Sequence, residues 1–226
     1  MISKFYTATE EFFHQLLQPV AKTTSDGSSV FAAAMKRFQE AYAMKLTTTM
    51  YMAGAAMCPS LNRRALKDTS AVEKLVIRLL PRPSTRSVWV GDVIAFNSPL
   101  GKISDPAQVM VRRVAAIEGT DMVSSAEEED FQIPAGHCWV LADNPEMKPP
   151  QVIDSRTFGF IPLSNIVGRV IYSGTSAVDH APVTNSPLAQ AMDDPILEAE
   201  VCLEELFRDP AAPQSDAGNG EQHSEK

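Results

Sequence analysis

The stretch VMVRRVAAIEG, residues 109–119, is rich in valine and isoleucine and has the composition of a β-strand. Such β-branched residues are enriched in strands because they pack well on a pleated surface. Two adjacent arginines, Arg112 and Arg113, interrupt this otherwise apolar run. Arginine is almost never fully buried unless it is paired, so the two side chains need an explanation beyond the formation of a strand.

Four further runs have the same texture and lie on either side of this one. They are KLVIRLL (74–80), SVWVGDVIAF (87–96), HCWVLA (137–142) and IVGRVIY (166–172). Turn-forming segments such as PRPST, NSPLGKISDP and DNPEMKPP separate them. Many short strands without intervening helical patterns predict a mainly β domain, a barrel or a sandwich, over residues 58–175.

The N-terminal zone, residues 1–57, has apolar residues at helical spacing and is predicted to be helical. It opens with acidic Glu10 and Glu11 and no apolar core, so neither a secretory signal peptide nor an arginine-rich transit peptide is expected. Residues 41–57 are the best membrane candidate, but they include Lys45 and fall short of the roughly 20 apolar residues of a span. We therefore expect an amphipathic or interfacial helix there, possible membrane association included.

The C-terminal zone, residues 176–226, is polar. DDPILEAEVCLEELF is predicted to form one short amphipathic helix, with Asp193 or Asp194 as its cap. The final residues have the composition of a disordered tail.

Composition excludes some classes of function. A chain of 226 residues with 44% hydrophobic residues can bury a core, and its net charge of -8 argues against a nucleic-acid partner. The three cysteines, Cys58, Cys138 and Cys202, lie far apart without a C-x-x-C motif. Ordinary thiols are expected, and no metal or cofactor.

Six motifs stand above this background. In chain order they are CPSL (58–61), GDVIAF (91–96), VRRVAAIEG (111–119), IPAGHCWVLADN (133–144), DSRTFGFIP (154–162) and IVGRV (166–170). In this order and spacing they resemble the type I signal peptidase family, especially its mitochondrial inner-membrane peptidase branch. The resemblance covers residues 58–172, about half of the chain, and DSRTFGFIP followed by a VGR strand is its most specific part.

The resemblance implies catalysis by a serine and a lysine. A serine hydroxyl is a weak nucleophile and needs an adjacent base, and lysine can be that base only where burial lowers its pKa. The nucleophile position falls on Ser60 in CPSL, where the family usually reads G-x-S-M. Cys58 then replaces the glycine, and Leu61 replaces the methionine.

The base position falls on Arg112, because the family strand reads (I/V)-K-R-(V/A) and Arg113 matches its arginine. A guanidinium stays protonated in proteins, so Arg112 cannot act as the base. A family serine that helps to hold the lysine amine corresponds to Val152. Asp154 and Arg156 are retained and are expected to form a structural ion pair, with Asp154 also a candidate partner of Arg112.

These departures predict a catalytically impaired accessory or scaffold subunit. The resemblance implies an organellar inner membrane as its location, mitochondrial first and plastid second. Its expected partners are an extended apolar peptide or preprotein segment and other subunits of an inner-membrane complex. The alternative is an active serine endopeptidase in which Ser60 is activated by another group. A self-cleaving repressor-type peptidase would need a DNA-binding helix-turn-helix and basic character, and neither is apparent.

Overall fold

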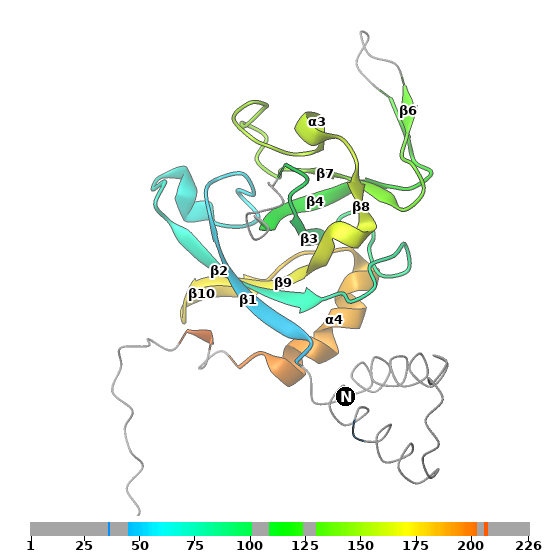
Figure 1. Cartoon of the computed structure of the whole chain (residues 1–226). Helices are drawn as coiled ribbons and strands as arrows, with labels where there is room; N and C mark the ends of the chain where they lie inside the picture. Colours follow the sequence, from blue (N-terminus) through cyan, green and yellow to red (C-terminus); the bar gives the residue numbers. More distant parts are fainter. Residues whose placement is uncertain (1–35, 37–44, 101–108, 124–129, 203–205, 208–226) are drawn as a thin grey trace, which may run out of the picture.

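In the computed structural model, the described residues are 36, 45–100, 109–123, 130–202 and 206–207 (Figure 1). One large antiparallel sheet dominates them, in the strand order β1-β2-β9-β3-β4-β7-β8, with β10 paired to β9. Its strands are β1 (Thr47–Ala53), β2 (Val72–Leu79), β3 (Val93–Asn97), β4 (Val109–Ile117), β7 (His137–Leu141), β8 (Ile161–Pro162), β9 (Ile166–Ser176) and β10 (Asp179–Pro182). The mainly β fold class is confirmed.

All five runs predicted as strands form strands, and one of them begins late. SVWVGDVIAF is extended only from Val93, because the residues before it make a turn. Gly91 adopts φ +97°, which is favourable only for glycine, and the Asp92 carboxylate accepts the backbone N–H of Trp89 at 3.0 Å. The sequence pattern therefore identified the strand but not the turn inside it.

The helix expected over residues 41–57 is corrected where the chain is described. Residues 47–53 form β1, which pairs with β2 from Thr47↔Arg78 to Ala53↔Val72. Three threonines and Tyr51 give this stretch a β preference of its own, which the Met- and Ala-rich composition of the longer run conceals, and pairing with β2 stabilises the strand. Residues 1–35 and 37–44 lie outside the described part, and no helix in the described ranges is long and apolar enough to cross a bilayer.

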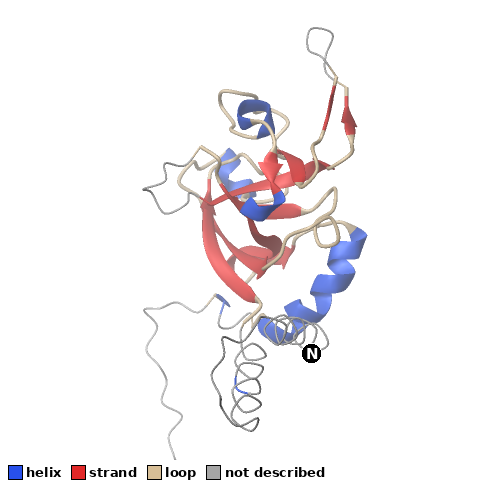
Figure 2. Cartoon of the chain, turned by 45° about the vertical axis from the view of Figure 1, so that its right-hand side comes forward, coloured by secondary structure: helices blue, strands red, loops and turns tan. Residues whose placement is uncertain are grey.

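The sheet has a core on each of its two faces, as the central strand β3 illustrates. Val93 and Ala95 join one buried cluster with Met52, whereas Ile94 and Phe96 join the other. Successive side chains of a strand point to opposite faces, so a strand that is apolar throughout must be covered on both. The strands accordingly curl around one another, with the long helix α4 at one side (Figure 2).

Helix α4 (Pro187–Glu200) begins earlier than predicted, and its cap is a different residue. The Ser186 side chain accepts the N–H of Ala189, and Pro187 follows at the first helical position, a favourable combination at a helix start. Asp193, one of the two predicted caps, instead lies within the helix and is buried. The correction has a tertiary cause, since the buried Arg169 and the half-buried Arg78 hold Asp193.

These arginines form an ion-pair network beneath α4. Arg169 of β9 has no exposed surface; its Nε donates to Asp193 at 2.6 Å and its Nη1 to Asp92 at 2.9 Å. Arg78 of β2 also pairs with Asp193. Asp92 accepts the N–H of Ser186 at 3.1 Å and its hydroxyl at 2.6 Å. The network therefore fixes the start and the middle of α4 against the sheet.

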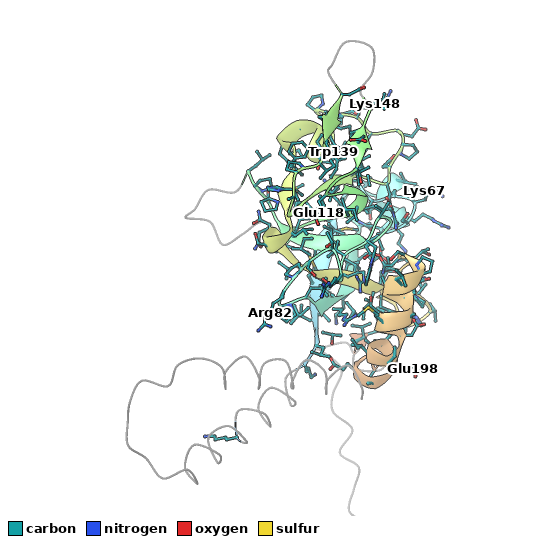
Figure 3. All side chains as sticks on the ribbon, turned by 90° about the vertical axis from the view of Figure 1, so that its right-hand side faces the viewer. Lys67, Arg82, Glu118, Trp139, Lys148 and Glu198 are labelled. Carbon is teal, nitrogen blue, oxygen red and sulfur yellow. The ribbon has the colours of Figure 1, made fainter. Side chains whose placement is uncertain are left out.

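The opposite end of the sheet carries an aromatic cluster. The rings of Phe131 and Phe160 lie 5.2 and 5.7 Å from Trp139, which Figure 3 labels near the top of the view. Phe131 belongs to the small hairpin of β5 (Asp121–Met122) and β6 (Phe131–Gln132). Trp139 is thus a packing residue that anchors this hairpin to β7.

Asp193→Ala should destabilise the fold by about 3 kcal/mol, because it leaves buried arginine charge uncompensated. Asp194→Ala, at an exposed position on the same helix, is the matched control and should stay within about 0.5 kcal/mol of the wild type. Urea unfolding followed by circular dichroism measures both. Equal losses in the two variants would contradict the role assigned to the network.

Candidate active site

The loop that follows β1 carries the first part of the site. It turns at Gly54, whose φ is +85°, and is held by Asn144. The backbone N–H of Asn144 donates to the Ala56 carbonyl at 3.0 Å, and its side-chain amide donates to the Ala55 carbonyl at 2.8 Å. The asparagine of the VLADN motif therefore positions the loop.

A cavity of about 380 Å³ lies between this loop, β1, the start of β4 and residues 151–153. Most of the residues that line it have apolar side chains, and Arg112 is the one charged side chain among the described residues in its lining. The lining residues are Met50, Tyr51, Met52, Ala53, Gly54, Ala56, Met57, Ser98, Leu100, Val109, Met110, Val111, Arg112, Gln151, Val152 and Ile153. We call this space the Arg112 cavity.

The Arg112 side chain is 9% exposed and is bonded only to backbone carbonyls. Its Nε and Nη2 donate to the Ile153 carbonyl at 2.9 and 2.7 Å, and its Nη1 donates to the Val111 carbonyl at 2.6 Å. Burial lowers the pKa of the guanidinium, and the nearby charge of Asp154 raises it. The group stays protonated near neutral pH, so it can donate hydrogen bonds but cannot take a proton from a serine.

Asp154 is fully buried and forms the expected pair with Arg156 rather than with Arg112. It accepts Nε of Arg156 at 3.0 Å and Nη2 at 2.6 Å. It also caps the short helix α3 (Ser155–Phe158) and accepts the N–H of Ala142 at 3.2 Å. Burial alone would raise the pKa of Asp154, but these hydrogen bonds and the charge of Arg156 hold it below its usual value. The pair fixes the turn that carries DSRTFGFIP.

Val152, which corresponds to the family serine, is 2% exposed and lies in the wall of the Arg112 cavity. A valine side chain has no hydrogen-bonding group. The position therefore supplies packing where the resemblance implies an orienting hydroxyl.

Ser60 is exposed and lines a different cavity, of about 630 Å³, so the structure does not bring it together with Arg112. Its hydroxyl has no hydrogen-bond partner among the described residues. Lys67 and His180 line the same cavity, but the ring nitrogens of His180 are engaged by the Tyr172 hydroxyl and the Ala177 carbonyl. In the described structure no base is hydrogen-bonded to Ser60.

Ala56 is one of the loop residues that line the cavity together with Arg112, and the sequence analysis did not single it out. The motif G-x-S-M also reads onto residues 54–57, GAAM, with glycine and methionine in place and Ala56 at the serine position. This match to the motif is the sequence signal that could have identified Ala56. Ala56 lies four residues before Ser60.

Comparisons with known proteins agree with the fold and the motifs. The family described as "Signal peptidase, peptidase S26" matches residues 121–173. Over 141 residues the chain is 43% identical to the mitochondrial ATP-independent inner membrane protease subunit 2 of Arabidopsis thaliana, covering 62% of this chain and 67% of that protein. The mitochondrial inner membrane protease subunit 1 of Mus musculus is 31% identical over 108 residues, 46% of this chain and 60% of that protein.

A third relative, the mitochondrial ATP-independent inner membrane protease subunit 1b of Arabidopsis thaliana, is 26% identical over 166 residues, 71% of this chain and 89% of its own length. The β fold, the ordered motifs and these similarities define a signal-peptidase-like protein, and the chain belongs to the signal peptidase family, peptidase S26. Within that family it falls in the branch of the mitochondrial inner membrane protease subunits.

Asp154→Asn should lower the stability at pH 7 by about 2 kcal/mol, because it removes a buried charge-assisted pair. The pKa of Asp154 is lower in the folded chain than in the unfolded one, so its contribution is complete above the unfolded value of about 4 and is lost as the pH falls below it. The difference between wild type and variant should therefore shrink from pH 7 to pH 3 in urea unfolding. Glu146→Gln, at an exposed position, is the control; a difference that grows in acid would contradict this assignment.

Proposed function

We propose that the chain is a catalytically impaired accessory subunit that binds an extended peptide at the Arg112 cavity. Its location is the mitochondrial inner membrane, which the names of its relatives specify. One observation carries the proposal: Arg112 and Ala56 line the same cavity, where the chemistry of the family needs a base and a nucleophile. A guanidinium cannot accept the proton, and a methyl group cannot attack a carbonyl. Ala56 is taken here as the nucleophile position in place of Ser60.

Binding without chemistry is supported by two strand edges at the cavity. Within the described ranges, β1 ends the sheet, and β7 pairs with β4 only from Arg113 onward. Residues 109–112 are thus paired with β3 alone. An extended peptide can add to such an edge through its backbone groups.

The rim of the cavity favours an apolar peptide. Tyr51, Leu100 and Ile153 are 68%, 56% and 41% exposed, and all three line this one cavity. Exposed apolar side chains gathered around a cavity commonly mark a binding site. The subunit would accordingly hold an apolar preprotein segment, and other subunits of the assembly would supply the cleavage.

The competing function is a serine endopeptidase that uses Ser60. The exposed hydroxyl in a cavity shared with Lys67 is the observation in its favour. It would need a free amine that comes within hydrogen-bonding distance of Ser60. Lys102, upstream of Arg112 in the sequence, lies outside the described residues and is tested directly below.

A penem-type serine probe should not label the wild-type chain, alone or in its co-purified assembly, when the label is read on this chain by mass spectrometry. Arg112→Lys alone should gain nothing, because Ala56 still lacks a hydroxyl. The double variant Ala56→Ser/Arg112→Lys should be labelled more strongly than the wild type and the single variant, since it restores the nucleophile and the base together.

Cleavage of a peptide with an apolar segment followed by Ala-x-Ala is assayed in parallel. Turnover by the wild type that disappears in Ser60→Ala would overturn the proposal. Lys102→Gln and Lys67→Gln would then identify the lysine that acts as the base.

A further inference from the structure

Arg112 forms no ion pair with any described residue, although the charge of Asp154 is near enough to raise its pKa. Its three hydrogen bonds go to neutral carbonyls, and the nearby Asp154 is already held by Arg156. The other arginines inside the sheet differ in this respect. Arg169 pairs with two aspartates, and Arg113 pairs with Asp143 at 2.6 Å. Arg112 is thus a buried cation that faces a cavity without an anion.

The hydrogen-bond donors of Arg112 that have no acceptor also favour an anionic ligand. Nη1 and Nη2 each carry two N–H groups, and each donates one bond in the described structure. One N–H on each terminal nitrogen therefore has no acceptor there. Two parallel N–H groups of a guanidinium match the two oxygens of a carboxylate, and a charge-assisted pair of this kind is strong when partly removed from water.

The remaining lining residues decide which kind of anion fits. Arg112 is the one charged group in the described lining, and Met50, Met57, Val109 and Val152 add apolar walls, so a singly charged anion fits better than a phosphate. These walls suit a carboxylate that is attached to apolar groups. The free strand edge at residues 109–112 suits an extended backbone that leads into the cavity.

We propose that the Arg112 cavity binds the C-terminal carboxylate of an extended apolar peptide, a proposal that rests on the peptide-binding function above. Hydrolysis of a peptide bond creates such a group, which makes the N-terminal product of a cleavage carried out elsewhere a fitting ligand. Ala56, which lines the same cavity, has a small side chain. In this proposal Ala56 removes the nucleophile and Arg112 supplies a permanent cation. The two replacements together would convert a site that cleaves a peptide into one that binds the C-terminus of a cleaved peptide.

The test compares one fluorescent peptide, ending in Ala-x-Ala, as the free acid and as the C-terminal amide. Fluorescence anisotropy should show the acid binding about 10- to 100-fold more tightly to the full wild-type chain, the range expected for a hydrogen-bonded charge pair. Arg112→Gln should reduce the preference to within about twofold. Arg82→Gln changes the same chemistry at an exposed position away from the cavity, labelled in Figure 3, and should keep the preference.

Each outcome decides between the two proposals. Equal binding of acid and amide would overturn the carboxylate site and leave peptide binding in place, whereas no binding of either would overturn both. An amidated peptide with an internal glutamate that binds as tightly as the free acid would overturn the assignment to a C-terminus. If thermal unfolding shows that Arg112→Gln does not fold, competition on the wild type decides: butanoate should displace the peptide, and butanamide should not.

Discussion

The fold depends on a charge that water cannot reach. Arg169 is completely buried on β9, in the middle of the sheet, and is stable there because Asp92 and Asp193 accept its hydrogen bonds from opposite sides. An isolated charge in such a place would cost far more than a domain of this size can offset. The pairing therefore requires β9, the turn before β3 and α4 to come together. These elements lie far apart in the sequence. They form one unit because detaching any of them would leave a buried charge without its partner, which is strongly destabilising.

The two arginines of β4 show what the same side chain does in different surroundings. Arg113 donates to Asp143 and to the carbonyls of Gly91 and Thr184, and so it links β4 to three other segments. Arg112 points instead into the cavity and meets carbonyls alone. Arg113 joins segments of the fold through an ion pair, whereas Arg112 forms no ion pair with any described residue. The two neighbours meet different surroundings because successive side chains of a strand point to opposite faces.

Prediction from the sequence succeeded where local pattern and tertiary environment agree. β2, β4, β7 and β9 were expected from their composition, because β-branched and aromatic runs between turns have few alternatives. It failed for β1, where the Met- and Ala-rich composition of the longer run was given more weight than the three threonines and Tyr51, and where pairing with β2 fixes the strand. It also failed for the start of α4, because the acidic residue that looked like a cap is the partner of buried arginines. In both cases a contact across the fold decided the outcome.

For the candidate site, too, the sequence determines some features and the tertiary structure determines others. The sequence by itself determined the family, through ordered motifs, and the absence of a base at Arg112, because the chemistry of a guanidinium does not depend on where it lies. Only the tertiary structure decided which loop residue faces it. The chain turns between Met57 and Leu61, closed by a 2.9 Å backbone hydrogen bond, so that residues four apart line different cavities. Ala56 lines the same cavity as Arg112 and Ser60 does not. Met57 and Cys58 are buried at that turn, and burial is a property of the folded chain.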